Sequence, residues 1–240
     1  MTSADNSHRC LVVLPTYQER DNIRATLAAV MAASPRADAI VVDDGSPDGT
    51  ADVVAAMSAN EPRIALLRRS GKLGLGTAYL AGFQRGLQSG YGALATMDAD
   101  GSHDPMRLPD MLACIDEGNA DLVIGSRYAR GGAVVNFSFA RKLNSAVANG
   151  VARRMLNLRV RDCTSGFRVY AASLLRTMRL DQLRSTGYSM LPEMLYEAAR
   201  AGARVAEVPI TFRNREKGVS KVTVSEILSW MRTVAALRRP

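Results

Sequence analysis

Short apolar runs and longer amphipathic stretches alternate along this chain. A run of about four to eight apolar residues bounded by turn-forming residues is typical of a buried strand, whereas apolar residues at every third or fourth position are typical of a helix. This criterion predicts strands over residues 10–14, 39–42, 64–67, 94–97, 121–125 and 205–208. A further strand is expected after the polar turn at residues 162–168. We expect Pro15 and Pro209 to end the first and the last of these strands.

Helical spacing fills most of the intervals between these strands. In the first interval, Ile23, Leu27, Val30 and Met31 lie on one face of the predicted helix. Further helices are predicted over residues 51–57, 79–87, 193–201 and 225–237. Alternating strands and helices favour a parallel sheet covered by helices on both faces. We therefore predict an α/β fold of three layers, α/β/α, around a mainly parallel central sheet.

Residues 139–158 form a long helical pattern after a loop-like stretch that contains Gly131 and Gly132. The apolar positions recur at steps of four, and basic residues flank them: Phe139, Leu143, Val147, Val151 and Met155, with Arg141, Lys142, Arg153 and Arg154. Such a helix can pack on the core with its charges in solvent. It can equally lie on a membrane surface. The pattern alone leaves both interpretations open.

Asp98 and Asp100 directly follow the predicted strand at residues 94–97. The period of two in a strand places both carboxylates on one side of its carboxyl end. Two carboxylates this close repel each other unless a cation lies between them, and oxygen ligands suit Mg²⁺ or Mn²⁺. The alternative is a polar turn after a buried strand, because Asp and Gly are common turn residues.

Asp43 and Asp44 follow the second predicted strand. Adjacent residues of a strand point to opposite faces, so this pair is a poor bidentate metal site. One carboxylate can accept hydrogen bonds from a ribose or a base while the other caps a turn, and Asp44 is the better candidate for the ligand. Ligands of parallel α/β sheets bind beyond the carboxyl ends of the strands, which is where both aspartate pairs lie.

The 31 Lys and Arg residues exceed the 23 Asp and Glu residues, which gives a formal net charge of +8. This excess favours anionic partners such as phosphates, nucleic acid or an acidic membrane surface. Cys10, Cys114 and Cys163 lie far apart, so we expect reduced, buried thiols without a disulfide or metal site. The first nine residues are not typical of a secretory signal, and no apolar run approaches the length of a membrane span.

Other common site types find little support. The Gly74-Leu75-Gly76 stretch lacks the full spacing of a dinucleotide fingerprint, and no Gly-Lys-Ser/Thr phosphate loop occurs. The chain has two histidines and no Gly-x-Ser-x-Gly elbow, which argues against serine hydrolase chemistry.

Five motifs occur in order along the chain, at residues 13–19, 41–50, 97–100, 125–128 and 164–168. Together they resemble the inverting family-two glycosyltransferases of GT-A fold. Within that family the chain is most similar to the polyprenol (dolichol) monophosphate mannose synthases, and residues 71–79 and 215–221 favour this subfamily. The resemblance extends from about residue 9 to residue 224.

This resemblance implies roles for individual residues. Those expected to bind the nucleotide sugar are Pro15, Tyr17, Glu19, Val42, Asp44, Asp98, Ala99, Asp100, Arg215 and Lys221. Asp98 and Asp100 would bind the divalent cation, Mg²⁺ or Mn²⁺, with Ser102 as a further ligand where many relatives have Gln. Those expected to hold the acceptor phosphate are Arg127, Arg141 and Ser145, and the catalytic set is Asp98, Asp100 and Arg127.

The implied activity is transfer of mannose from GDP-mannose to polyprenyl phosphate with inversion, by a catalytic domain over residues 1–224. Residues 225–240 would form a basic amphipathic helix, packed on the domain or at the membrane surface. We expect a peripheral enzyme that works on the cytoplasmic face of a membrane and does not bind nucleic acid. A membrane-anchoring partner protein or a fused domain is a candidate aid to this association. The alternatives are another donor, such as UDP-glucose, or a non-catalytic binder of acidic membranes.

Overall fold

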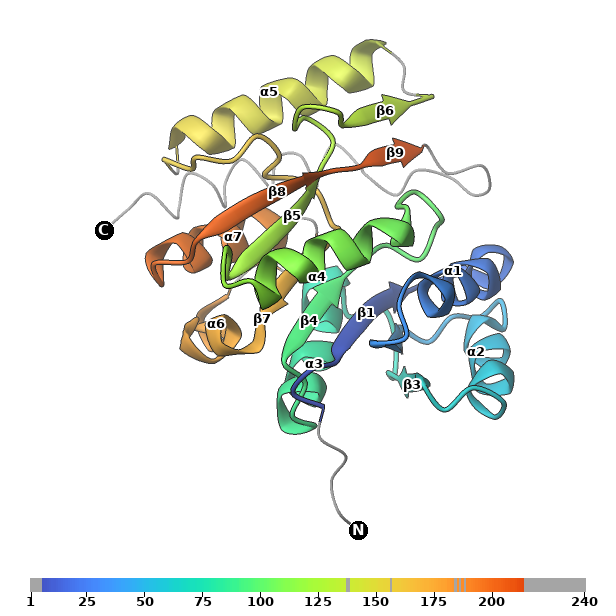
Figure 1. The fold of residues 1–240 in the computed structure, drawn as a ribbon. Helices are drawn as coiled ribbons and strands as arrows, with labels where there is room; N and C mark the ends of the chain where they lie inside the picture. The colour runs from blue at the N-terminus through green and yellow to red at the C-terminus, as the bar shows by residue number, and fades with distance from the viewer. Residues whose placement is uncertain are drawn as a thin grey trace.

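The computed structural model describes residues 6–136, 139–155, 157–183, 185, 187 and 189–213, and for residues 139–144, 148 and 155 it describes the backbone alone. Within these residues a seven-stranded sheet runs in the order β3-β2-β1-β4-β7-β5-β8, with a two-stranded sheet, β6-β9, beside it (Figure 1). The helix that we predict over residues 225–237 lies outside the described residues, as do Arg215 and Lys221.

Six strands of the large sheet fall on the predicted apolar runs, and the seventh is the strand predicted after the polar turn at residues 162–168. They are β1 (Cys10–Thr16), β2 (Ala37–Asp43), β3 (Ile64–Arg68), β4 (Ala93–Thr96), β5 (Leu122–Ser126), β7 (Arg168–Ala171) and β8 (Val205–Pro209). All neighbours pair in parallel except β7, which is antiparallel to β4 and β5. The predicted mainly parallel sheet is therefore confirmed, and the strand predicted after the polar turn of the last motif is β7.

The expectation that Pro15 ends the first strand is wrong. β1 continues through Pro15, which is paired with Val42 of β2, and ends at Thr16. On the other side of β1, the pairing with β4 stops at Val13. Because one side of β1 is open at this point, a residue without an N–H group is tolerated.

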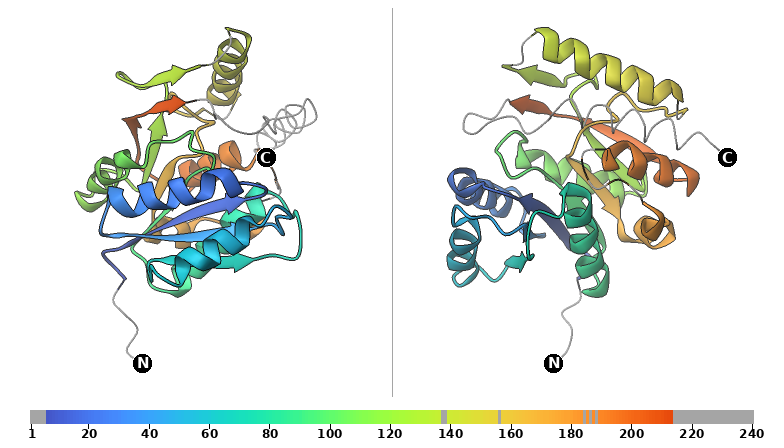
Figure 2. Two further views of the ribbon diagram at one scale, coloured as in Figure 1. Left: turned by 90° about the vertical axis from the view of Figure 1, so that its right-hand side faces the viewer. Right: turned by 180° about the vertical axis from the view of Figure 1, so that it is seen from behind.

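Helices cover both faces of the sheet (Figure 2). One layer contains α1 (Arg20–Ala33), α2 (Thr50–Ser58) and α4 (Leu108–Asp116), and the other contains α3 (Leu75–Gln88), α6 (Ala172–Thr177) and α7 (Met190–Arg200). The side chains of β1 alternate between the two cores, because Val12 and Leu14 face the first layer whereas Leu11 and Val13 face the second. The predicted three-layer α/β/α architecture is confirmed.

The short strands β6 (Ala133–Val135) and β9 (Thr211–Arg213) pair in parallel beside helix α5 (Phe139–Met155), and β9 continues directly from β8 of the main sheet (Figure 1). The sequence predicts a loop for the whole stretch around β6. A strand of three residues forms there because β9, which is distant in sequence, supplies its partner. Sequence periodicity cannot reveal such a partner.

Helix α5 does not bury the described part of its predicted apolar stripe. The side chains of Val147 and Val151 are exposed, at 57% and 36%, whereas Asn149 and Ala152 are buried. The buried face of α5 is thus rotated away from the stripe. None of the helices in the described part of the chain combines the length and the apolar character needed to cross a membrane.

The three cysteines are free, as predicted. Cys10 and Cys163 are fully buried, and burial raises the pKa of each thiol to about 12. Cys114 departs from the expectation, because it is only half-buried. The two buried thiols behave as small core side chains, since a thiol that stays protonated is a poor nucleophile.

Candidate active site

A cleft opens at the carboxyl ends of β1, β2 and β4, where the order of the strands reverses. Its walls consist of Pro15, Thr16, Tyr17, Glu19, Asp44, Lys72, Gly74, Leu75, Ala78, Asp98, Ala99, Asp100 and Gly187. The chain passes from β1 to β2 and β3 on one side of β1 and returns to β4 on the other side. Such a switch point leaves a crevice between the outgoing loops, which is the usual ligand site of this fold.

Seven of the ten residues predicted to bind a nucleotide sugar line this cleft: Pro15, Tyr17, Glu19, Asp44, Asp98, Ala99 and Asp100. Val42 does not, because its side chain is fully buried in the core. It is paired with Pro15 in the β1–β2 ladder and therefore lies next to a residue of the cleft wall. Arg215 and Lys221 lie outside the described residues.

Glu19 and Tyr17 form the wall next to the start of α1. The Glu19 N–H donates to Thr50 Oγ1 at 3.0 Å, and Asn22 Nδ2 donates to Glu19 Oε2 at 2.9 Å, so the carboxylate is held at the first turn of α1. Lys72 Nζ lies 4.7 Å from the centre of the Tyr17 ring. This cation–π contact places a positive charge at the rim of the cleft.

The two aspartates after β2 have different partners. Asp43 accepts hydrogen bonds from Thr16 Oγ1 at 2.9 Å and from the Ser46 N–H at 2.9 Å, and therefore stabilises the turn. Asp44 forms an ion pair with Arg69 and accepts the N–H groups of Leu73 and Gly74 at 3.0 and 3.1 Å. Only Asp44 lines the cleft, where it holds the loop before α3 in place.

Asp98 and Asp100 lie on the cleft wall just beyond β4. Asp100 Oδ1 accepts the Ser102 N–H at 3.0 Å. Asp98 Oδ1 lies 3.5 Å from the Tyr79 hydroxyl, and Asp98 Oδ2 lies 3.4 Å from His103 Nε2. Ser102, predicted as a further metal ligand, is buried and does not line the cleft.

Gly166 brings the turn before β7 against Asp98. A Cβ atom at Gly166 would lie 3.3 Å from Asp98 Oδ1, which is closer than most side chains tolerate. Thr96 Oγ1 donates to the Gly166 carbonyl at 2.7 Å and fixes this approach. The motif at residues 164–168 therefore packs directly against the Asp98 carboxylate.

Arg127 lies at the end of β5 and is bound to Asp162 through two parallel hydrogen bonds. Its Nε and Nη2 donate to the two Asp162 oxygens at 2.8 and 2.7 Å, and Nη2 also donates to Thr164 Oγ1 at 2.6 Å. The sequence predicts Arg127 as a ligand of the acceptor phosphate. In the structure most of its donors are already engaged within the protein, which the sequence could not show.

The Arg127–Asp162 pair is buried and strongly coupled. Burial alone raises the pKa of the Asp162 carboxyl, but the Arg127 guanidinium and the N–H groups of Arg127 and Thr164 outweigh it and hold that pKa below its ordinary value. Asp98 is among the charges that raise the pKa of Arg127. The arginine and the cleft carboxylate are therefore close enough to interact electrostatically.

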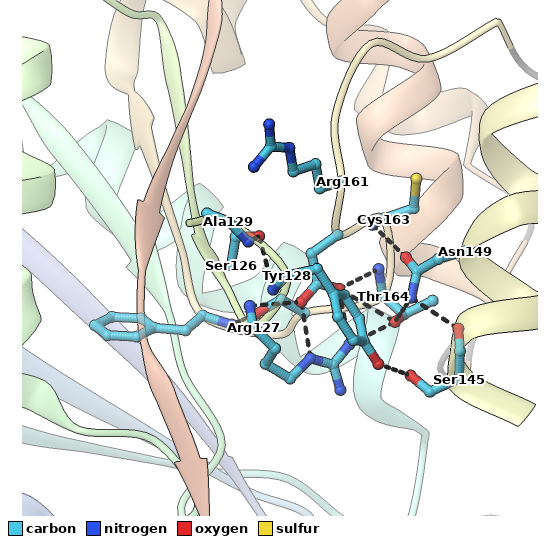
Figure 3. A network of polar contacts seen from close by, with 12 residues as sticks. Ser126, Arg127, Tyr128, Ala129, Ser145, Asn149, Arg161, Cys163 and Thr164 are labelled. Carbon is cyan, nitrogen blue, oxygen red and sulfur yellow. Dashed lines mark hydrogen bonds and ion pairs between the residues drawn. The ribbon is translucent and has the colours of Figure 1, made fainter. Parts of the chain in front are cut away.

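A polar network connects this pair to helix α5 (Figure 3). The Tyr128 hydroxyl donates to Ser145 Oγ at 2.7 Å. Asn149 Nδ2 donates to the Ser145 carbonyl at 2.9 Å and to Thr164 Oγ1 at 3.2 Å, while its Oδ1 accepts the Cys163 N–H at 2.7 Å. The network joins the end of β5, the turn before β7 and α5 into one unit. Of Arg141, only the backbone in α5 is described.

Sequence reasoning missed several members of the site. Lys72 belongs to the Gly-rich stretch at residues 71–79, but no local pattern indicates that it packs on Tyr17. Asp162 binds Arg127, and Asn149 binds Thr164 and Cys163 in the turn before β7. Only the tertiary structure shows these contacts. The sequence assigns no role to His103, although it follows the Asp98–Asp100 pair by three residues.

A doubly wound sheet with a carboxylate pair at its switch point defines an α/β ligand-binding protein. The sequence profile described as "Glycosyl transferase family 2" matches residues 11–179, and the chain belongs to this family. The predicted family and GT-A fold are thereby confirmed.

Two curated relatives match most of the chain. The undecaprenyl-phosphate mannosyltransferase of Micrococcus luteus is 46% identical over 215 residues, covering 90% of this chain and 88% of the relative. The polyprenol monophosphomannose synthase of Mycolicibacterium smegmatis is 44% identical over 230 residues, covering 95% of this chain and 86% of the relative. The predicted resemblance to polyprenol monophosphate mannose synthases agrees with these relatives.

Solved structures share the fold at low identity. The glucosyl-3-phosphoglycerate synthase of Mycobacterium tuberculosis, in complex with Mn²⁺, uridine-diphosphate-glucose and phosphoglyceric acid, has a TM-score of 0.63 and 19% identity, covering 96% of this chain and 78% of that chain. This structural similarity supports the fold of the chain. At 19% identity it does not identify the ligands of the cleft.

Proposed function

We propose that this chain transfers mannose from GDP-mannose to the phosphate of a polyprenol, with inversion at the anomeric carbon. The observation that carries the proposal is the carboxylate pair Asp98 and Asp100 in the switch-point cleft, within electrostatic range of buried Arg127. The two curated relatives, named for undecaprenyl phosphate and polyprenol, support the acceptor class and the mannosyl group. The donor nucleotide is inferred from the resemblance to this subfamily.

The donor would occupy the cleft with its base and ribose against Pro15, Tyr17, Glu19 and Asp44. Arg69 contacts Asp44 Oδ1 through two nitrogens, and the Leu73 and Gly74 N–H groups donate to Oδ2, so a nucleotide hydroxyl would share an acceptor oxygen with one of these donors. Lys72 would add positive charge near the phosphates. Asp44 thus has two roles in the proposal, to shape the cleft and to bind the nucleotide.

Asp98 and Asp100 would hold a divalent cation, Mg²⁺ or Mn²⁺, that bridges the diphosphate. Two oxygen ligands on one wall fit this role, because Mg²⁺ is commonly held by one or two carboxylates together with substrate phosphates and water. Among the described residues no cluster of three His, Cys, Asp or Glu side chains surrounds one point. A bound cation stabilises negative charge on the departing diphosphate. Buried Ser102 would contribute through its N–H bond to Asp100 rather than as a ligand.

The acceptor phosphate would lie between Arg127 and α5, which carries Ser145 and, four residues earlier, Arg141. Asp162 offsets much of the Arg127 charge, so we assign Arg127 mainly to orienting the phosphate for in-line attack. A phosphate monoester is already ionised near neutral pH and needs no general base. This chemistry suits a cleft wall that holds carboxylates and no nucleophile–histidine pair among the described residues.

Arg215 and Lys221 would close over the donor phosphates. The Arg213 N–H donates to the Ser102 carbonyl at 3.0 Å, so β9 ends beside the loop that carries Asp98 and Asp100. Arg215 follows two residues later, and two residues span at most about 7 Å. This attachment point supports a role for the following segment at the diphosphate.

The enzyme would work as a peripheral protein on the cytoplasmic face of a membrane, because its acceptor is a lipid. Exposed Val147 and Val151 lie on α5 with exposed Arg153 and Arg154, a combination typical of contact with an anionic lipid surface. A membrane-anchoring partner protein or a fused domain would strengthen this association.

A donor and acceptor screen tests the proposed function. Purified protein is incubated with radiolabelled GDP-mannose or UDP-glucose, a short polyprenyl phosphate, and Mn²⁺ or Mg²⁺, with a chelator control. We expect a mannolipid from GDP-mannose only, and none with chelator. Transfer from UDP-glucose alone would overturn the donor assignment, and liposome binding without any transfer would favour a non-catalytic binder.

A further inference from the structure

His103 is a buried histidine whose ring nitrogens form no hydrogen bond within the described part of the chain. Its side chain is 1% exposed, and neither Nδ1 nor Nε2 forms a hydrogen bond with the described residues. Burial of polar atoms without a hydrogen bond is unfavourable, so such atoms call for an explanation. The family assignment and the proposed activity give His103 no role.

The surroundings of His103 fix the direction of its ring. The ring centre lies 5.6 Å from that of Phe167 and 5.0 Å from that of Phe212, which meets it edge-on at 78°. On the cleft side, Nε2 lies 3.4 Å from Asp98 Oδ2. This distance is slightly longer than a normal hydrogen bond of about 2.7–3.2 Å. A small adjustment of either side chain would close it.

His103 lies behind Asp98 as seen from the cleft. The Asp98 side chain is 24% exposed and lines the cleft, whereas the His103 side chain is buried and does not. The ring therefore suits a partner of the carboxylate better than a direct ligand of a cation. Carboxylates that bind metals are commonly oriented by hydrogen bonds from behind, and loss of such a partner weakens metal binding.

We propose that His103 is a positioning residue for the divalent cation, with Nε2–H donating to Asp98 Oδ2 so that the carboxylate is held in its metal-binding orientation. This inference rests on the proposed function, because it requires a cation at Asp98. The two phenylalanine rings hold the imidazole, and the imidazole holds the carboxylate. A purely structural alternative is that His103 only fills the space between Phe167 and Phe212.

Three substitutions separate positioning from packing. His103→Phe keeps an aromatic ring in the slot and removes the donor. In His103→Gln the side-chain amide nitrogen can reach the position of Nε2, whereas in His103→Asn it reaches only the position of Nδ1. If His103 positions Asp98, His103→Gln should keep the Mn²⁺ affinity that His103→Phe and His103→Asn lose. If His103 only fills space, His103→Phe should be the replacement that changes the protein least.

The readout is the dissociation constant of Mn²⁺, measured by electron paramagnetic resonance in the presence of GDP, without turnover. We expect His103→Phe and His103→Asn to raise this constant about 10- to 100-fold, and His103→Gln to stay within a few-fold of the unaltered chain. Equal constants for all three variants would overturn the inference, as would tighter binding by Phe than by Gln. If His103→Phe does not fold, the contrast between Gln and Asn decides.

Asp98→Asn serves as the reference in the same assay. If Asp98→Asn leaves Mn²⁺ binding unchanged, the metal role in the proposed function fails and the inference fails with it. If Asp98→Asn loses binding while His103→Phe and His103→Asn do not, the metal site stands and only the role of His103 is refuted.

Discussion

At the residue scale, four carboxylates near the cleft differ in what surrounds them. Asp44 and Asp162 are each bound by an arginine and stabilise a loop or a turn. Asp98 and Asp100 line the cleft instead, where the described contacts are a tyrosine hydroxyl, a histidine ring and one backbone N–H. A carboxylate that lines a cleft can add a cation to its ligands, whereas the charge of Asp44 and Asp162 is already offset by an arginine.

Substitution of the cleft carboxylates tests this distinction. We expect Asp98→Asn or Asp100→Asn to lower mannosyl transfer about 100-fold or more, because loss of cation binding removes several kcal/mol of transition-state stabilisation. Asp104→Asn is the matched control, since Asp104 is exposed in the same loop and accepts only the Met106 N–H among the described contacts. Initial rates at saturating Mn²⁺ and unchanged circular dichroism would check the prediction. Asn variants as active as the control would contradict it.

The Arg127–Asp162 pair makes a prediction about stability. Asp162→Asn should destabilise the fold by about 3–5 kcal/mol, because it leaves the buried Arg127 charge without its partner. Asp52→Asn is the control, because its ion pair with Arg68 is exposed and is expected to contribute at most about 1 kcal/mol. Urea unfolding at neutral pH measures both. If Asp162→Asn lowered the free energy of unfolding only as much as the control, the prediction would be wrong, because Arg127 would then have found another partner.

The Asp162 carboxylate also makes the stability of the fold depend on pH in the acid range. The pKa of Asp162 is lowered in the folded chain, whereas an unfolded Asp has a pKa of about 3.9. Between these two values the unfolded chain binds more protons, so this stabilisation is complete above about pH 5 and is lost as the pH falls below about 4. In urea unfolding as a function of pH, Asp162→Asn should lose this part of the acid slope, and Asp52→Asn should keep it.

At the scale of elements, α3 lies unusually close to the sheet because it carries glycines on its inner face. A Cβ atom at Gly82 would lie 2.3 Å from Val13 Cγ1, and one at Gly86 would lie 2.5 Å from Leu94 Cδ2. Neither glycine has a positive φ, so close packing rather than backbone conformation requires them. This close approach sets the position of the first turn of α3, which lines the cleft.

Gly82→Ala should therefore destabilise the fold by about 1–3 kcal/mol through overpacking, although alanine is the better helix former. Gly150→Ala provides the opposite case, because Gly150 lies in α5 and no atom of the described residues is within 4 Å of a Cβ atom there. For Gly150→Ala we expect the free energy of unfolding to increase by roughly 0.5–1 kcal/mol. Thermal unfolding of both variants gives the comparison, and a stabilised Gly82→Ala would refute the packing argument.

At the scale of the whole molecule, the positive net charge and the exposed face of α5 relate the fold to a lipid acceptor. The net charge of +8 is a property of the whole chain, whereas Val147 and Val151 concentrate apolar surface at one place. Basic residues contribute about 1 kcal/mol each near an anionic surface, which supports reversible association. Ser145, which hydrogen-bonds to Tyr128 and Asn149 and is proposed to hold the acceptor phosphate, lies on the same helix.

Flotation with liposomes tests this arrangement. We expect binding to anionic vesicles that weakens at high salt, and a loss of roughly tenfold or more when Val147 and Val151 are both replaced by Ser, because about 1 kcal/mol of burial is lost at each position. Met106→Ser is the control, since Met106 is 59% exposed but lies in the short helix before α4. Equal recovery on neutral and anionic vesicles at all salt concentrations would contradict the electrostatic part.

Much of the fold follows from local pattern. The apolar runs predict six of the strands because a buried parallel strand needs a short, continuous apolar stretch, and the alternation with helices predicts the three layers. The position of Asp98 and Asp100 directly after such a run also places them at the ligand edge of the sheet. These features depend on neighbouring residues, which a sequence displays directly.

Only the tertiary structure decided which distant residues meet. The β6–β9 pair, the stacking of Lys72 on Tyr17 and the binding of Arg127 by Asp162 each join segments that are well separated along the chain. The rotation of α5 that exposes Val147 likewise depends on the residues packed beneath the helix. His103 beside Asp98 belongs to the same group, because Phe167 and Phe212 orient its ring. Such contacts depend on the packing of the whole chain, and hydrophobic periodicity cannot predict them because it reflects only residues that are close in sequence.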